Sequence, residues 1–140
     1  MMKGIFVIAI ISFFFSCATQ SEIIEYKYTQ ATQMGKTTIA VTKDSIVKSF
    51  AGRGAPSRTA FVTSPKNWAD LNAAMEKVEL KNLGNLTAPT NKRQTDIAPY
   101  GRLYFTTKDS TYRSLDFDGT DAHADLEGVM VVFEELLKLR

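Results

Sequence analysis

Cysteine and histidine are almost missing from this chain of 140 residues, which contains one of each, Cys17 and His123. A single cysteine excludes an intramolecular disulfide, so the hydrophobic core has to hold the fold without covalent help. A single histidine excludes a metal site built on several histidines. What remains to be explained is the position of Cys17, close to the start of the chain.

The chain also lacks a strong excess of one charge and the short motifs of common enzymes. It carries 17 Lys and Arg against 15 Asp and Glu, whereas a nucleic-acid-binding surface needs a clustered basic excess. There is no nucleophile elbow, no His-Glu-x-x-His, no phosphate loop and no dinucleotide fingerprint. We therefore expect no nucleic-acid partner, no cofactor, and a domain that binds rather than catalyses.

The first residues have the composition of a secretory leader. Lys3 supplies a positive charge, an apolar run follows from Ile5 to Phe15, and Ser16 is a small residue ahead of Cys17. The run is shorter than the roughly 20 apolar residues that a membrane-spanning helix needs. The pattern predicts a signal peptide at 1–16 and export of the chain.

The end of this leader, Phe14-Phe15-Ser16-Cys17, resembles the signal of bacterial lipoproteins, in which a small residue precedes a lipidated cysteine. The resemblance implies that Cys17 carries acyl chains, that 17–21 form a short tether, and that the membrane is a partner through this lipid. No aspartate follows Cys17, which implies the outer membrane of a Gram-negative envelope. The alternative is an ordinary signal peptide with a cysteine near its cleavage site.

Residues 22–140 have the length of one domain, and their pattern predicts an α+β fold. Apolar residues alternate along the first strand, with Ile24, Tyr26 and Tyr28 on one face. Ser64 and Pro65 predict the start of one helix, and Asp121 is the expected N-cap of the other. The expected strands are 22–29, 37–42, 46–51, 59–63, 101–107 and 111–117. We expect an antiparallel sheet of about five to six strands with two helices on one face and the other face open to solvent or a partner.

Two stretches of the chain resemble one another. Residues 42–50 align without gaps on 107–115, and 69–75 align on 124–130. The two halves are either copies of one hairpin-helix unit or the result of convergence between common turns and amphipathic helices. Both interpretations stay open.

The connection at 81–99 is rich in Asn, Gly, Thr, Pro and Lys, with Leu83, Leu86 and Ile97 as its expected anchors. A connection of this length inside a compact domain is usually functional or mobile. We expect this segment and the open sheet face to form the contact surfaces.

The densest polar cluster runs from Asp116 to Glu127 and includes Asp118 and Asp121. Several carboxylates in one turn favour a hard cation such as calcium, although the glycine stands fourth rather than sixth, unlike in an EF-hand. The alternative is a strand end, a glycine turn and a capped helix start, all of which favour Asp. These four acidic residues are the metal candidates, and the three aspartates with His123 form the candidate site of a hydrolytic or metal-dependent enzyme.

Two weaker patterns concern ligands and modification. Basic residues in the two long loops are candidate contacts for an anionic glycan or lipid headgroup, although loops collect solvated charges in any case. They are Arg53, Arg58, Lys92 and Arg93. Ser45 and Ser110 each follow an aspartate in a three-residue motif that resembles the acceptor of a bacterial periplasmic O-glycosylation system.

These patterns favour an envelope-anchored lipoprotein with a non-catalytic domain that binds an envelope protein or glycan. One alternative is an enzyme that uses the polar cluster between Asp116 and Asp125. The other is a structural or assembly subunit of a larger envelope complex.

Overall fold

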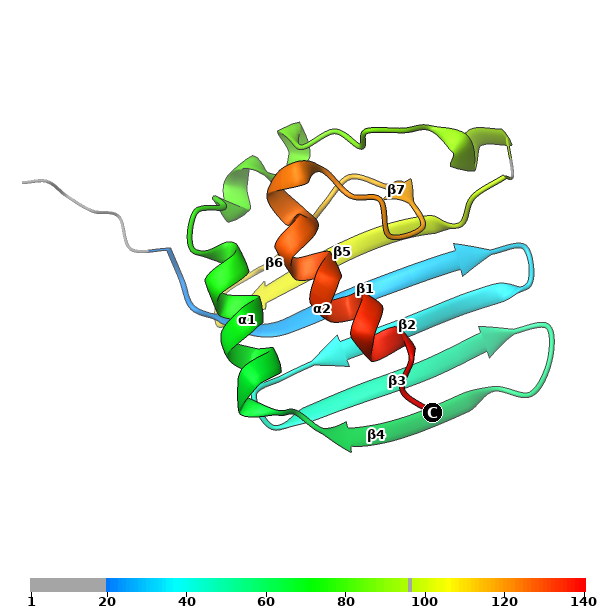
Figure 1. Cartoon of the computed structure of the whole chain (residues 1–140), viewed down its shortest axis with the longest axis horizontal. Helices are drawn as coiled ribbons and strands as arrows, with labels where there is room; N and C mark the ends of the chain where they lie inside the picture. The colour runs from blue at the N-terminus through cyan, green and yellow to red at the C-terminus, as the bar shows by residue number, and fades with distance from the viewer. Residues whose placement is uncertain (1–19, 96) are drawn as a thin grey trace, which may run out of the picture.

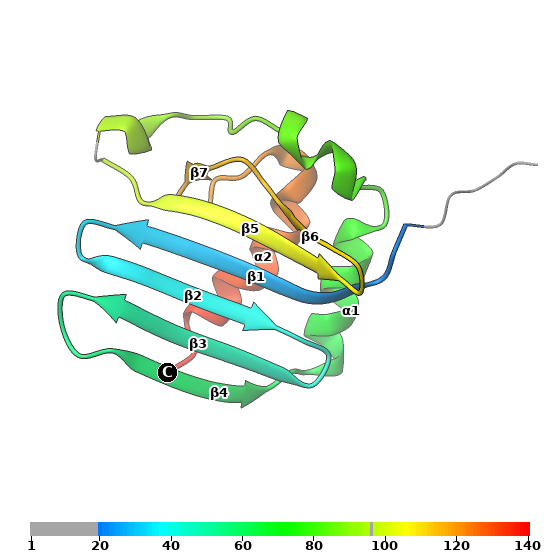
Figure 2. The same cartoon turned by 180° about the vertical axis from the view of Figure 1, so that it is seen from behind.

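The computed structural model describes residues 20–95 and 97–140, which form two layers (Figure 1). One layer is an antiparallel sheet, and the other contains α1 (Pro65–Met75) and α2 (Glu127–Leu137), which pack on the same face of the sheet. The opposite face carries no helix of the described residues (Figure 2). The predicted α+β fold is therefore confirmed. In the part of the chain that is described, no helix has the length and apolar character to cross a membrane.

The sheet has the strand order β4-β3-β2-β1-β5-β6, and the short β7 pairs with β5 next to β6. The strands are β1 (Ile23–Thr32), β2 (Gly35–Val41), β3 (Ser45–Gly52), β4 (Ser57–Val62), β5 (Tyr100–Thr107), β6 (Thr111–Arg113) and β7 (Phe117–Asp118). The predicted strand at 111–117 is thus interrupted between β6 and β7, because Ser114 bonds the Leu103 N–H through its hydroxyl at 3.0 Å. β1 is central and β4 forms one edge.

The start of β1 differs from the prediction. Ile23 is buried and Ile24 is 49% exposed, so the expected inward position of Ile24 is wrong. A register shift against β5 between Ile23 and Glu25 exchanges the two faces, as an extra residue in one strand does. From Tyr26 onward the alternation follows the prediction, with Tyr26 and Tyr28 fully buried.

Tyr26 and Tyr28 form the centre of the core between the sheet and the helices. The Tyr26 ring lies edge-on to Trp68 with 5.5 Å between centroids, and its hydroxyl donates to Asn72 Oδ1 at 2.8 Å. The Tyr28 hydroxyl donates to the Gly119 carbonyl at 2.7 Å. Both buried hydroxyls are therefore satisfied. Burial raises the pKa of both phenols, so both stay neutral.

The first helix begins where the sequence predicts. The Ser64 hydroxyl accepts a hydrogen bond from Asn67 N at 3.0 Å, and Pro65 is the first helical residue. α1 ends at Met75, and Val78 is buried beyond the end of the helix.

The second helix does not begin with Asp121 as its N-cap, and that prediction is wrong. The Asp121 N–H donates to the Asp118 carbonyl at 2.8 Å, which holds Asp121 in a tight turn. A short 3-10 helix, η3 (Ala124–Leu126), precedes α2. His123 caps η3, since its Nδ1 accepts from Asp125 N at 3.1 Å.

The connection between the two halves is ordered along the β6 and β7 edge of the sheet (Figure 1). It contains two 3-10 helices, η1 (Leu80–Asn85) and η2 (Lys92–Thr95). Leu83 and Leu86 are buried as expected, but Ile97 is 76% exposed and its predicted anchoring role is wrong.

The two aligned hairpin turns share one hydrogen-bond pattern. Thr42 N–H donates to the Ser45 carbonyl at 2.9 Å, and Thr107 N–H donates to the Ser110 carbonyl at 2.8 Å. Each threonine hydroxyl also accepts from the amide of the same serine. The next strands differ, because β4 adds beside β3 whereas β7 pairs with β5. The likeness covers the turns, and the repeat stays a hypothesis.

Candidate binding site

The open face of the sheet gathers basic side chains from different strands. Strand register places Lys27 of β1 opposite Tyr104 of β5, and Thr29 opposite Arg102. Lys36 of β2 lies on the same face, opposite Ala31. Because alternate residues of a strand point to opposite faces, these side chains point away from the helices.

Two of these basic residues contact one aromatic ring. Lys27 Nζ lies 5.1 Å from the centroid of the Tyr104 ring, and Arg102 Nη1 lies 3.5 Å from its hydroxyl oxygen. The Arg102 hydrogen bond lowers the pKa of Tyr104, and the charges of Arg102, Lys36 and Lys27 lower it further. Three cations therefore act on this ring, and carboxylates of Glu25 and Asp116 lie beside two of them. We call Lys27, Lys36, Arg102 and Tyr104 the basic cluster.

Asp116 fixes one member of this cluster. Its Oδ1 accepts from Arg102 Nε at 2.6 Å, with both side chains 31% exposed. The hydrogen bond to Asp116 raises the pKa of Arg102 above its already high value, so the guanidinium stays charged. Asp116 thus orients Arg102 on the open face.

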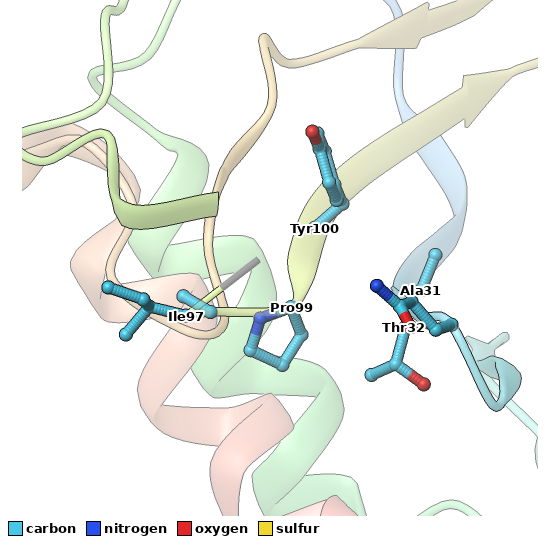
Figure 3. Close-up of a pocket in the computed structure, with 7 residues that line it drawn as sticks. Ala31, Thr32, Ile97, Pro99 and Tyr100 are labelled. Atoms are coloured by element: carbon cyan, nitrogen blue, oxygen red, sulfur yellow. The ribbon is translucent and has the colours of Figure 1, made fainter. Parts of the chain in front are cut away.

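An apolar pocket lies at one end of the sheet (Figure 3). It has a volume of about 430 Å³ and is lined by Ala31, Thr32, Gln33, Ile97, Ala98, Pro99 and Tyr100. In Figure 3, Ile97 and Pro99 lie across from Ala31 and Thr32. Register places Ala31 between Lys36 and Tyr100, which joins this end pocket to the basic cluster.

Asp118 has a structural role, and we call its contacts the Asp118 clamp. The carboxylate is 5% exposed. Its Oδ2 accepts from the Thr90 hydroxyl at 2.5 Å and Lys92 N at 2.7 Å, and its Oδ1 accepts from Arg93 N at 2.8 Å and Arg93 Nη1 at 3.1 Å. Burial by itself would raise the pKa of Asp118, but these hydrogen bonds outweigh it and hold that pKa well below its usual range. The ionised carboxylate therefore fastens the connection to β7.

The four predicted metal ligands do not converge. Asp116 pairs with Arg102, and Asp118 uses both oxygens in the clamp. The carboxylates of Asp121 and Asp118 meet through the Thr90 hydroxyl, which lies 3.2 Å from Asp121 Oδ2. Glu127 begins α2. Over 20–95 and 97–140, no three His, Cys, Asp or Glu side chains form a group suited to a metal ion.

The alternative enzyme hypothesis needs His123 and the nearby aspartates to face one pocket, and their contacts are structural instead. Nδ1 of His123 accepts the Asp125 amide and lies 3.8 Å from the Asp125 carboxylate, so this nitrogen is engaged in capping. Asp118 is buried among donors rather than facing a pocket with His123. The structure does not bring the predicted acid and base groups into one catalytic arrangement.

The four basic loop residues do not form one anion site either. Arg53 follows β3 and Arg58 lies on β4, at one edge of the sheet. Lys92 and Arg93 belong to η2, along the other edge, and Arg93 is bound to Asp118. The four residues therefore lie at opposite edges of the sheet, and contact of any of them with an anionic ligand stays a prediction.

The predicted modification sites lie apart from the end pocket. Ser110 is exposed in its turn, and half-buried Ser45 has its hydroxyl 3.2 Å from that of Thr42. Glycosylation at both stays a prediction. Cys17 lies outside the described residues, so lipidation stays a prediction too.

Comparison with protein-family models, curated proteins and solved structures gave no match for this chain. Sequence reasoning missed the basic cluster because its members come from three strands. The usable signal was the outward position of Lys27 in the alternating pattern of the first strand. Joining Lys27 to Lys36 and Arg102 requires the strand order, which the pattern does not give.

Proposed function

We propose that this protein is an envelope lipoprotein, anchored through Cys17, whose domain binds an acidic partner protein on its open sheet face. The observation that carries the proposal is the continuity of the basic cluster with the apolar end pocket. No helix of the described residues covers this face (Figure 2). A binding role requires no catalytic groups.

The charges of the open face favour an anionic partner. Lys36 is exposed, and Lys27 lies 3.9 Å from the Glu25 carboxylate, a long contact between half-exposed groups. Such surface pairs contribute little, so both lysines remain available for a ligand. Clustered charges of one sign also speed the encounter with a partner of opposite sign.

The end pocket favours a protein over a plain acidic glycan. Its volume of about 430 Å³ and its Ile97, Pro99 and Tyr100 lining suit an aliphatic or aromatic side chain. An acidic protein surface with one protruding apolar side chain would fill the pocket and neutralise the lysines. A glycan without an acyl group would neutralise the lysines but would not fill the pocket. The partner class is therefore an acidic envelope protein.

The position of the tether agrees with this role. Gln20 leads into the beginning of β1, whereas Thr32, at the other end of this ten-residue strand, lines the end pocket. At about 3.3 Å per residue, the strand separates the two by roughly 30 Å. A lipid on Cys17 would hold one end of the domain at the membrane and leave the end pocket facing away.

A crosslinking experiment tests the proposal. A photocrosslinking residue in place of Tyr100 should form an adduct with one envelope protein in cells. The double reversal Lys27→Glu and Lys36→Glu should abolish this adduct. The control, Lys77→Glu with Lys81→Glu, makes the same change of net charge at exposed positions outside the sheet and should retain it. An adduct that persists undiminished after reversal of the open-face lysines would refute the proposal.

Competitors then identify the ligand class. A glutamate-rich peptide with one phenylalanine should displace the partner, whereas an acidic polysaccharide should compete weakly because it leaves the end pocket empty. An oligonucleotide that competes best would contradict the expected absence of a nucleic-acid partner. For the anchor, the intact mass of membrane-extracted protein should equal residues 17–140 plus acyl chains, and a lipid-free mass would refute it.

A further inference from the structure

The two edges of the sheet are protected to different degrees. Along one edge, η1 lies beside β6 and η2 lies beside β7, where the Asp118 clamp holds the connection in place. Among the described residues, no segment extends the sheet beyond β4 at the other edge (Figure 2). Most of β4 is exposed, and Val62 is 86% exposed. β4 is therefore an open edge strand.

One hydrogen bond identifies which backbone groups of β4 point away from β3, toward the open edge. Thr63 N–H donates to the Asp44 carbonyl at 3.2 Å, and Asp44 lies opposite Thr63 in the continued β3–β4 register. In an antiparallel ladder, hydrogen-bonded residues alternate with residues whose N–H and C=O point away. Counting back from Thr63 in steps of two, the odd-numbered residues pair with β3. Arg58, Ala60 and Val62 therefore direct their backbone groups outward.

Most of the usual protections of an edge strand are missing from β4, which carries a single charged side chain, Arg58. Its register with β3 is regular over six paired residues, without a bulge. The strand contains no proline and no lysine. Proteins commonly block edges with these devices, because unpaired backbone groups are a template for another extended segment. Adding a strand to such an edge is a known mode of peptide recognition.

A groove beside β4 would receive side chains of an added strand. It has a volume of about 310 Å³ on the helix side of the sheet, and its lining includes Phe50, Thr59, Phe61 and Leu139. Alternate side chains of a segment paired with β4 would point to this side, next to Phe61. The other side chains would point to the open face, next to Arg58.

Charge selects among the occupants of this edge. Residues 51–62 contain Arg53 and Arg58 and no acidic residue. A second copy of the chain would bring like charges together, whereas an acidic segment would complement them. We propose that the β4 edge binds an extended acidic segment of a partner protein as an additional antiparallel strand. Its apolar residues would face the groove and its acidic residues would face Arg58.

A labelled peptide of alternating Glu and Val tests this proposal on the detergent-solubilised protein, with fluorescence anisotropy as the readout. A peptide of the same composition with its Glu and Val residues in separate blocks is the control. The alternating peptide should bind at least about tenfold more tightly, because only its pattern matches both faces of the added strand. Equal binding of the two peptides would overturn the proposal.

Variants of β4 separate edge pairing from simple charge attraction. Ala60→Pro removes a backbone donor that faces outward and leaves the β3 ladder intact, so peptide affinity should fall by about tenfold. Ala60→Val keeps that donor and should bind normally. Arg58→Glu should reject the Glu peptide and accept a Lys and Val peptide. Full binding by an Ala60→Pro variant of unchanged melting temperature would overturn the proposal.

Two further measurements distinguish peptide binding at the β4 edge from binding at the open face and from dimerisation. Ile97→Asp, in the end pocket, should leave peptide binding at β4 unchanged. Loss of binding in that variant would place the peptide on the open face and overturn the edge proposal. Sedimentation should show a monomer, and a dimer that Ala60→Pro abolishes would identify a second copy as the occupant instead of an acidic segment.

Discussion

The ammonium group of Lys48, on β3, donates a hydrogen bond to the main-chain carbonyl of Leu137, in the last turn of α2, at 2.7 Å. The same nitrogen donates to the Leu139 carbonyl at 2.9 Å. The last carbonyls of a helix have no partner within the helix, and positive charge is favourable there. A lysine that points to the helix side of the sheet therefore caps the helix packed above it.

The first prediction concerns this cap. Lys48→Met keeps most of the aliphatic stem and removes both hydrogen bonds, so the free energy of unfolding should fall by about 1.5 to 3 kcal/mol. Urea denaturation measures the change. Lys43→Met, at an exposed turn position, is the control and should stay within about 0.5 kcal/mol of the parent. Equal stability of the two variants would show that the cap contributes nothing.

The second prediction uses the pH dependence of the Asp118 clamp. The pKa of Asp118 is well below its usual range in the folded chain, compared with about 3.9 in an unfolded one. The ionised carboxylate thus stabilises the fold above about pH 4, and this stabilisation is lost as pH falls through the folded pKa.

Asp118→Asn should therefore lower stability at pH 7 and flatten its fall between about pH 4 and 2. Urea denaturation at several pH values measures both effects. Asp109→Asn, in an exposed turn, is the control and should stay within about 0.5 kcal/mol of the parent at pH 7. Parallel acid profiles for the parent and Asp118→Asn would contradict the clamp.

The third prediction tests a close backbone approach at the start of β5. A Cβ atom at Gly101 would collide with the Gly119 carbonyl oxygen and the Phe117 ring. Gly101→Ala should therefore destabilise the fold by about 2 kcal/mol or more, measured by thermal unfolding. At Gly84 nothing lies within 4 Å of an added Cβ, so Gly84→Ala should be neutral or stabilising by up to about 1 kcal/mol. The reverse order of stability would be inconsistent with this packing.

The fourth prediction separates the two parts of the open-face site. Salt screens exposed charges, with a Debye length of about 10 Å at 0.1 M and 3 Å at 1 M. The yield of the Tyr100 adduct should therefore fall as salt is raised. Ile97→Asp should lower the yield at every salt concentration, because it places a charge in the end pocket. The Lys27→Glu, Lys36→Glu variant should give no adduct at low salt, and any yield should rise with salt because screening weakens the repulsion from the acidic partner. A salt-independent yield in the parent would exclude charge recognition.

How much of this fold the sequence predicts depends on the range of each interaction. Ser64 and Pro65 begin a helix through contacts within one turn, so their pattern is sufficient. Ile24 turns outward because β1 shifts its register against β5, about 80 residues later in the chain. Asp121 loses its capping role to a turn bond with Asp118. The local sequence correctly indicates which conformations each residue favours. Contacts with residues far away in the chain determine which of these conformations the residue adopts.

The candidate site was less predictable for the same reason. Lys27, Lys36 and Arg102 lie up to 75 residues apart in the chain and share one face only because β1 pairs with both β2 and β5. The acidic residues from Asp116 to Asp121 are close in sequence, and this proximity is why the sequence suggested a metal site there. Their proximity serves a turn, an ion pair and the clamp instead.

The position of β1 also determines how the domain resists mechanical force. A pull at Gln20 passes directly into β1, which is bonded to β2 on one side and β5 on the other. Tension between this end and a partner at the end pocket runs along the strand, perpendicular to the hydrogen bonds, so the bonds of both ladders share the force. The Gln20 side chain adds a bond from Leu80 N–H at 2.9 Å. An edge strand such as β4 would instead peel off one bond at a time. A domain tethered by its central strand can thus remain folded under tension that would unzip one held by its edge.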